Sequence, residues 1–389
     1  MKRILYILPL LLTLLLTPGG AQAQQVKFSH YRDMRNYLKN SKKTDAENLI
    51  KKLTPADSIE KPYLQGMLNQ YLFEQQNIKL YYGEKVDTAS VFKTLYSMFE
   101  SFETSYPKVK NTDQYYKPMQ MALQTHQNNL RIGGNYFITR KDYKEAYKFY
   151  SIFLRMDENK VITPNDSVLG SVFNNAIIIA SNLQMFGDVV NLAEKAHATN
   201  HDSETIDLQL CDALRKMQRE DEWVSAVKDA MQHHPQQFAF YGMLIDYYLK
   251  GNHAEEASKL AEDLIQNDST NYVNCFVKGY VCQQTQDIDT ALKWLHKSHE
   301  IKSDYPPVLT NLGFCTVRKA EQTENSIDHF PFTAEEKAQI QSIYREAESY
   351  LEESRKLDPK DQQHWAPLLW KCYYKLNEGE KLDEIEKLM

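Results

Sequence analysis

The stretch YVNCFVKGYVCQQTQDIDTALKWLHKS, residues 272–298, contains the pattern that decides the fold. Apolar and aromatic residues recur at helical spacing on both sides of a short turn at Gln286-Asp287-Ile288. A small residue, Gly279, lies in the first helical segment, and Ala291 follows twelve residues later in the second. Small residues are needed where two helices cross closely, while larger apolar residues fill the space around them. The stretch therefore predicts two amphipathic helices that pack against each other.

The same arrangement recurs along the chain. Small or apolar residues follow one another in steps of 34 at Cys211, Ile245, Gly279 and Gly313. The second small residue recurs too, twelve positions after the first, as in the pair Gly134 and Ala146. Two steps are longer, 46 residues from Gly134 to Ala180 and 56 residues from Gly313 to Leu369, and we attribute both to insertions. A repeat of this length indicates stacked supersecondary units.

This pattern resembles the tetratricopeptide repeat. Residues 127–160 match it at Leu130, Gly134, Phe137, Ala146 and Tyr150. Further units begin at residues 238, 272, 306 and 362. Two more units, 173–203 and 204–237, match the pattern only at a few positions. The resemblance therefore covers residues 127–389. It implies an all-α solenoid of stacked antiparallel helix pairs in a right-handed superhelix, with the first helices lining a concave surface that binds partners.

The longest step predicts an insertion at about 319–336, between the two helices of one unit. Thr333 and Glu336 have the spacing of a capping box, which predicts that the delayed second helix begins there. For Phe330-Pro331-Phe332 we favour an anchor that folds back on the solenoid, because apolar tips are usually covered. The alternative is an exposed recognition tip.

Residues 24–126, which precede the regular repeats, have a less regular pattern of apolar residues. We expect helices near 30–40, 44–53, 59–80 and 86–105, with Asp87 as an N-cap and breaks at Pro55 and Pro107. They are interpreted as divergent repeats or a terminal cap.

The first residues, 1–23, have the form of a secretory signal peptide. A basic start is followed by an apolar run of about 13 residues, too short for a membrane span, and by the small-x-small sequence Ala21-Gln22-Ala23. The expected location is the periplasm or outside the cell. Without a Cys after the cleavage site, a lipoprotein anchor is not expected.

The mature chain would keep 44 basic and 52 acidic residues, a net charge of −8 (44 − 52). A negative net charge does not favour nucleic-acid binding.

The sequence contains no common catalytic, phosphate-binding or metal-binding motif. The cysteines are interpreted as small core residues, with an inter-repeat disulfide as the alternative; they are Cys211, Cys275, Cys282, Cys315 and Cys372. Pairs such as His197 and His201 lack residues that would complete a metal site. We therefore expect no enzyme activity, no metal and no cofactor.

The resemblance also implies which residues face the groove. In the C-terminal units they are Phe276, Tyr280, Phe314, Arg318, Trp370, Tyr373 and Tyr374. Aromatic residues and Arg dominate binding hot spots, so this set is the candidate partner-binding surface. The competing interpretation is that these aromatics belong to the core or are covered by the insertion.

The leading hypothesis is thus a non-enzymatic scaffold of the bacterial cell envelope that binds a protein or peptide. The alternative is an exported protein that captures glycans or nutrients by stacking sugars on the same aromatics. Triplets such as Asp166-Ser167-Val168 resemble the O-glycosylation motif of exported Bacteroidetes proteins, although helix N-caps explain several of them equally well.

Overall fold

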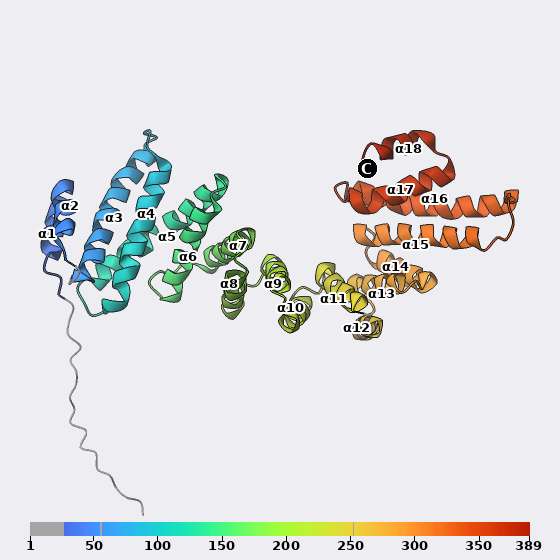
Figure 1. Ribbon diagram of the computed structural model, residues 1–389, viewed down its shortest axis with the longest axis horizontal. Coiled ribbons are helices and arrows are strands. Elements are labelled where there is room, and N and C mark those ends of the chain that lie inside the picture. Colours follow the sequence, from blue (N-terminus) through green and yellow to red (C-terminus); the bar gives the residue numbers. More distant parts are fainter. Residues whose placement is uncertain (1–26, 55–56, 252) are drawn as a thin grey trace, which may run out of the picture. The chain divides into compact units, whose positions relative to one another are not determined.

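The computed structural model describes residues 27–54, 57–251 and 253–389, and the predicted signal peptide lies outside them (Figure 1). Over these ranges the secondary structure is helical, without a β-strand. The chain divides into two compact units, with the boundary between His201 and Asp202. We call them unit 1 and unit 2.

Unit 1 is a series of helices in which each packs on the next. They are α1 (Tyr31–Lys39), α2 (Lys43–Lys52), α3 (Glu60–Tyr81), α4 (Thr88–Ser105), the 3-10 helix η2 (Tyr106–Lys108), α5 (Tyr116–Thr139), α6 (Tyr143–Glu158), α7 (Asp166–Asn182) and α8 (Phe186–Ala198). The four predicted N-terminal helices are confirmed within a few residues. Asp87 caps α4, since its carboxylate accepts a hydrogen bond from the Ala89 amide at 3.1 Å. α5 runs without a break across position 126, the expected boundary of the regular repeats.

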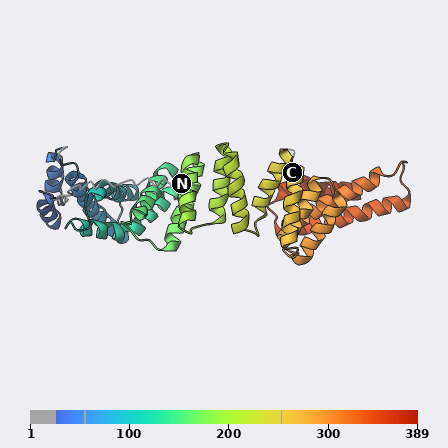
Figure 2. The same cartoon turned by 90° about the horizontal axis from the view of Figure 1, so that it is seen from below.

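Unit 2 continues the same pattern (Figures 1 and 2). Its helices are α9 (Glu204–Lys216), α10 (Glu220–His233), α11 (Phe238–Lys250), α12 (Ala254–Asn267), α13 (Tyr272–Gln284), α14 (Ile288–Ile301), α15 (Pro306–Asn325), α16 (Ala334–Leu357), α17 (Gln362–Leu376) and α18 (Gly379–Glu386). The turn predicted at Gln286-Asp287-Ile288 separates α13 from α14, and the Asp287 side chain caps α14. The all-α class and the paired helices are thus as predicted.

Glycines lie at the crossing points of three of the regular helix pairs. A Cβ on Gly279 would lie 2.8 Å from Leu295 Cγ, and one on Gly134 would lie 2.8 Å from Tyr150 Cζ. In both pairs the contacting residue follows the glycine by sixteen positions. The contact therefore recurs at the same position of both repeats. Gly313 faces Leu351 in the same way across the longer pair α15–α16. The alanines twelve residues on, such as Ala291, are fully buried.

An additional crossing of this kind, which the sequence pattern did not reveal, occurs between α3 and α4. A Cβ on Gly66 would lie 2.6 Å from the Phe102 ring. The two residues are 36 positions apart, against sixteen for Gly134 and Gly279, because both helices are long, so the spacing of the regular pairs does not reveal this contact. This contact supports the interpretation of α3–α4 as a divergent repeat.

The insertion lengthens helices instead of forming a long loop. Residues 319–325 belong to α15 and 334–336 to α16, so the connection is only 326–333 (Figure 2). The physical reason is burial, because Ala320 and Ile340 contribute to a core cluster that continues along both helices. The capping box is confirmed: Thr333 accepts from the Glu336 amide at 3.2 Å, and the Glu336 carboxylate accepts from the Thr333 amide at 2.7 Å.

The two phenylalanines of the connection differ. Phe332 packs against the core cluster of α15–α18 and acts as the expected anchor. Phe330 is 86% exposed, so the anchor interpretation is wrong for this residue. Only Phe332 reaches the core, and the Phe330 ring contacts it from the solvent side at a centroid distance of 5.8 Å.

The five cysteines are buried and free, as the core interpretation predicted. Burial raises the pKa of the Cys211, Cys315 and Cys372 thiols to about 12. No inter-repeat disulfide joins them.

Candidate functional site

The predicted site residues come from the first helices of three successive pairs, α13, α15 and α17. On each helix two of the groove positions are four residues apart, so they share one face. On α15 they hold Phe314 and Arg318, and on α17 Trp370 and Tyr374, while on α13 the first of them holds Tyr280. Each of these side chains is at least partly exposed.

Two predicted residues, Phe276 and Tyr373, are each only 1% exposed. Phe276 lies among the rings of Phe238 and Tyr305, at centroid distances of 4.5 and 5.6 Å. The Tyr373 hydroxyl donates to Glu352 on α16, and Lys381 lies over its ring at 5.3 Å. Both therefore point toward neighbouring helices, and we leave them out of the candidate surface.

Trp370 and Tyr374 form a parallel stack on α17. Their ring centroids are 5.5 Å apart and their planes differ by 4°. The indole Nε1 donates to Glu386 of α18 at 3.0 Å, which fixes the orientation of Trp370. Tyr374 is 60% exposed, so the stack presents its outer ring to solvent.

Phe314 and Arg318 form a second pair on α15. The Arg318 guanidinium lies 5.3 Å from the Phe314 ring centroid and 2.9 Å from a Glu321 carboxylate oxygen. The same carboxylate accepts a hydrogen bond from Lys371 of α17. Glu321 thereby joins the two helices between the Phe314–Arg318 pair and the Trp370–Tyr374 stack.

A second ion pair holds α15 and α17 in register, since Lys375 Nζ lies 2.7 Å from Glu324. We call Phe314, Arg318, Trp370 and Tyr374 the aromatic surface. Each of its members is positioned by a contact that the structure shows, so the surface is preorganised. The structure places these four predicted residues on two helices, α15 and α17, that contact each other and are bridged by these ion pairs.

Tyr280, in contrast, forms a contact with a neighbouring helix. Its hydroxyl lies 3.4 Å from Asp246 of α11. Burial and the Asp246 carboxylate raise the pKa of Tyr280 to about 12. This hydroxyl is engaged within unit 2, and we leave Tyr280 out of the aromatic surface.

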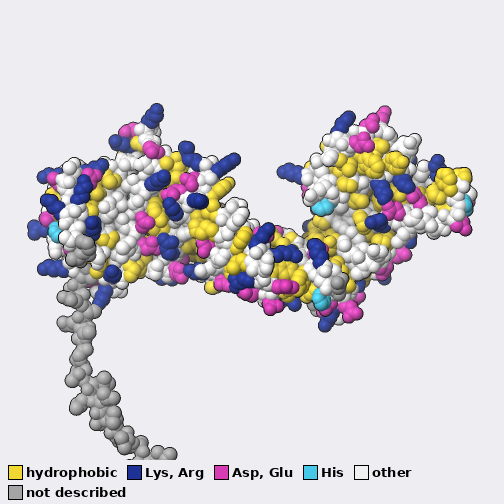
Figure 3. Space-filling view, viewed as in Figure 1, with side chains coloured by type: hydrophobic (Ala, Val, Ile, Leu, Met, Phe, Trp, Pro, Cys, Tyr) yellow, Lys and Arg dark blue, Asp and Glu magenta, His cyan; other side chains and the backbone are white. Residues whose placement is uncertain are grey.

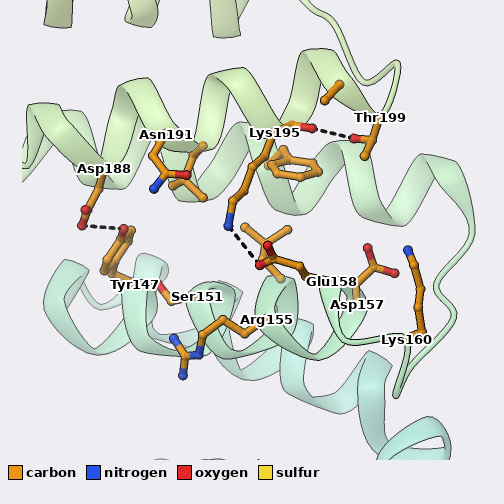
Figure 4. Close-up of a pocket in the computed structure, with 14 residues that line it drawn as sticks. Tyr147, Ser151, Arg155, Asp157, Glu158, Lys160, Asp188, Asn191, Lys195 and Thr199 are labelled. Carbon is orange, nitrogen blue, oxygen red and sulfur yellow. Dashed lines mark hydrogen bonds and ion pairs between the residues drawn. The ribbon is translucent and has the colours of Figure 1, made fainter. Parts of the chain in front are cut away.

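A cleft of about 490 Å³ in unit 1, between α6 and α8, was not found from the sequence (Figure 4). Its walls are bridged by a hydrogen bond from Tyr147 to Asp188 at 2.9 Å and by an ion pair of Lys195 with Glu158 at 2.9 Å. Arg155, also in the lining, binds Glu103 at 2.6 and 3.0 Å. The polar groups of Tyr147, Arg155 and Lys195 in this lining are thus each engaged with a carboxylate.

Among the described residues there is no group of three or more His, Cys, Asp or Glu side chains placed to hold a metal ion. In the same part of the chain, no helix combines the length and the apolar character that a membrane span requires.

Comparison with known proteins gives no matching family model and no matching curated protein. Among solved structures, the chain is similar to a TPR repeats protein from Bacteroides fragilis, with a TM-score of 0.28 and 17% identity, over 68% of this chain and 99% of that one. It is also similar to the C-terminal part of a TPR repeat-containing protein from Cytophaga hutchinsonii, with a TM-score of 0.37 and 13% identity, over 66% of this chain and 93% of that one. The MamA protein matches 47% of this chain and 87% of its own, with a TM-score of 0.31 and 14% identity.

The fold itself rests on this chain's own geometry. Helix pairs follow one another, and a glycine in the first helix faces a large residue sixteen positions later in two of them. The same contact recurs at Gly313 with the inserted residues added to the spacing. The described residues of the chain thus form an all-helical fold of successive packed helix pairs.

Proposed function

We propose that this protein is a non-enzymatic binding protein and that the aromatic surface of unit 2 holds a protein or peptide partner. The observation that carries the proposal is the exposed Trp370–Tyr374 stack beside the Phe314–Arg318 pair. Aromatic residues and Arg lose little conformational freedom here on binding, because contacts within unit 2 already orient them.

The arrangement favours a polypeptide over a sugar. One face of the Trp370 indole is covered by Tyr374, and its N–H is used by Glu386. A sugar ring that stacks on an indole needs an open face, whereas a peptide can pack on the outer Tyr374 ring and bond to Arg318. Glycan capture is therefore the second candidate, and inhibition of partner binding by soluble glycans would favour it.

The proposal of a scaffold without catalysis is supported by the state of the thiols and the acids. Burial raises the pKa of Cys211, Cys315 and Cys372, which disfavours the nucleophilic thiolate. The acids near the aromatic surface, Glu321 and Glu324, are paired with Lys371 and Lys375. Turnover by the purified chain in a panel of hydrolase assays would contradict this part of the proposal.

Export to the periplasm or beyond is a separate proposal, motivated by residues 1–23. Cell fractionation followed by mass spectrometry of the N-terminus tests it. We expect a chain that begins near residue 24 in the periplasmic or extracellular fraction. An intact Met1 in the cytoplasm would contradict the proposal.

Partner binding is tested by cross-linking in the native cell envelope and then with the purified mature chain. The double variant Trp370→Ala/Tyr374→Ala should weaken binding of the captured partner by about tenfold or more, since buried aromatic anchors contribute about 2 kcal/mol or more. The matched control is Tyr81→Ala/Tyr82→Ala, which removes two rings that are 85% and 75% exposed in unit 1. Equal affinity of both variants would remove the aromatic surface from the function.

A further inference from the structure

Charge is distributed unevenly along the chain. The segment 27–54, which holds α1 and α2, contains eight basic and three acidic residues, a net charge of +5 (8 − 3). Residues 202–389 contain 21 basic and 34 acidic residues, a net charge of −13 (21 − 34). A chain with an overall charge of −6 thus carries a concentrated basic segment near the start of its described part. Figure 3 shows Lys and Arg side chains over the end of unit 1 that holds α1 and α2.

Part of this charge lines a groove. A cavity of about 680 Å³ lies between α1 and Gln114-Tyr115 of the segment before α5. From α1 it is lined by Arg32, Arg35, Asn36 and Lys39, which follow the spacing of a single helical face. Phe28 and Tyr31 complete the lining, which contains no carboxylate. We call this cavity the α1 basic groove.

The three cations of the groove have no ion pair with any carboxylate of the described residues. Glu60, the acid beside the start of α1, is occupied by His30, whose amide donates to it at 2.6 Å. Arg32 lies in the first turn of α1, where the helix dipole disfavours a positive charge. Like charges on one helical face also repel one another. An anion in the groove would reduce both the unfavourable interaction of Arg32 with the helix dipole and the repulsion between the cations.

The wall opposite α1 is rigid. Tyr115 stacks on Phe28 at a centroid distance of 4.2 Å, and its hydroxyl accepts a hydrogen bond from the Phe28 amide at 2.9 Å. The Tyr63 hydroxyl donates to the Tyr115 carbonyl at 2.8 Å. Gln114 also donates to the Tyr115 hydroxyl, at 3.0 Å. The groove is therefore preformed, and a ligand would not have to order this wall.

The spacing of the cations suits an extended chain of acidic residues. Arg32, Arg35 and Lys39 follow at intervals of three and four residues, about 4.5 and 6 Å along the helix axis. Side chains on one face of an extended peptide recur about every 6.6 Å, within the reach of these long side chains. A single small anion would meet only one or two of the three cations.

We propose that the α1 basic groove binds an extended acidic peptide segment of a partner protein, with Arg32, Arg35 and Lys39 each contacting a carboxylate. The site lies in unit 1 and does not depend on the aromatic surface of unit 2. Its partner is recognised by alternating acidic residues, which the rigid tyrosine wall keeps extended.

The test measures binding of a labelled peptide of alternating glutamate and serine residues, about eight residues long, by fluorescence anisotropy with the full mature chain. The variant Arg32→Gln/Arg35→Gln/Lys39→Gln should weaken binding by about tenfold or more. The control Lys42→Gln/Lys51→Gln/Lys52→Gln removes the same charge from exposed positions of the same segment that do not line the groove. It should change the affinity by no more than about threefold, and circular dichroism checks the helicity of both variants.

Three outcomes would overturn the proposal. Equal losses in the two triple variants would mean that the peptide responds to net charge alone. Displacement of the peptide by millimolar inorganic phosphate would point to a small-anion site. Co-sedimentation with phosphatidylglycerol vesicles that depends on Arg32, Arg35 and Lys39, without peptide binding, would assign the groove to a membrane surface. A peptide of alternating glutamine and serine should not bind.

Discussion

At the residue scale, the repeat depends on glycines that permit close approach of two helices. Gly279 is the clearest case, because a Cβ there would meet Leu295 at both Cγ (2.8 Å) and the backbone nitrogen (3.2 Å). Rotation of the leucine side chain relieves the first contact but not the second. We expect Gly279→Ala to lower the free energy of unfolding by about 1–3 kcal/mol through overpacking.

Urea denaturation measures this change, and Gly187→Ala is the matched control. Gly187 lies in helix α8, and a Cβ added there would have no neighbouring atom within 4 Å, so alanine fits. The control should be neutral or stabilising by less than about 1 kcal/mol. If both substitutions had the same effect, helix propensity and not close packing would explain the effect of replacing Gly279.

A second prediction at this scale concerns the hydroxyl of Tyr147 in the α6–α8 cleft. Burial and its hydrogen bond to Asp188 raise the pKa of Tyr147 to about 12 from the usual 10.0. Above pH 10 the unfolded chain releases this proton first and binds fewer protons than the folded chain. The contribution of Tyr147 to the free energy of unfolding is therefore fully present below pH 10 and is lost as the pH rises toward about 12.

We expect Tyr147→Phe to make that loss shallower in urea titrations at several alkaline pH values. Tyr81→Phe, at a position 85% exposed, should leave the pH dependence unchanged. An unaltered slope in the Tyr147 variant would show that other groups cause the alkaline loss.

At the element scale, α15 and α16 show how an insertion is absorbed by longer helices. The capping box of Thr333 and Glu336 defines the first turn of α16. Thr333→Ala removes the side-chain acceptor, so we expect fraying of that turn at a cost of about 1 kcal/mol. Amide hydrogen exchange over residues 334–340 should accelerate about fivefold, because local opening becomes easier by that amount.

The control is Thr94→Ala in α4, where the hydroxyl donates to Ser90 within the helix. That substitution removes no cap and should leave exchange in α4 within about twofold. Unchanged exchange at the start of α16 would mean that packing of Phe332 alone fixes the turn.

At the scale of the whole molecule, each unit has its own core. Unit 2 contains one cluster around Trp365 and Leu369 and another around Phe276 and Leu295. We expect residues 202–389 to fold alone and to unfold cooperatively, because these clusters draw on helices of unit 2 only.

Tryptophan fluorescence provides the measurement, since Trp223, Trp294, Trp365 and Trp370 all lie in unit 2. The fluorescence transition of the full chain in urea should coincide with that of the fragment. A fragment without a cooperative transition would show that unit 2 needs unit 1 to fold.

The candidate site was only partly predictable, and Phe276 and Tyr373 show why. Their positions in the repeat placed them with Trp370 and Tyr374, yet both are buried. Helical periodicity fixes the direction of a side chain on its own helix. It does not fix how far the neighbouring helix covers it, which for Tyr373 is decided by Glu352 and Lys381.

The sequence by itself determined the helix pairs, their glycine crossings at Gly134, Gly279 and Gly313, and the capping box, because these depend on local spacing and chemistry. Only the tertiary structure decided the length of α15 and α16, the exposure of Phe330, and the α1 basic groove. These features arise from contacts between residues that are far apart in the chain, such as Phe28 and Tyr115. Local patterns contain no information about which distant surfaces will meet.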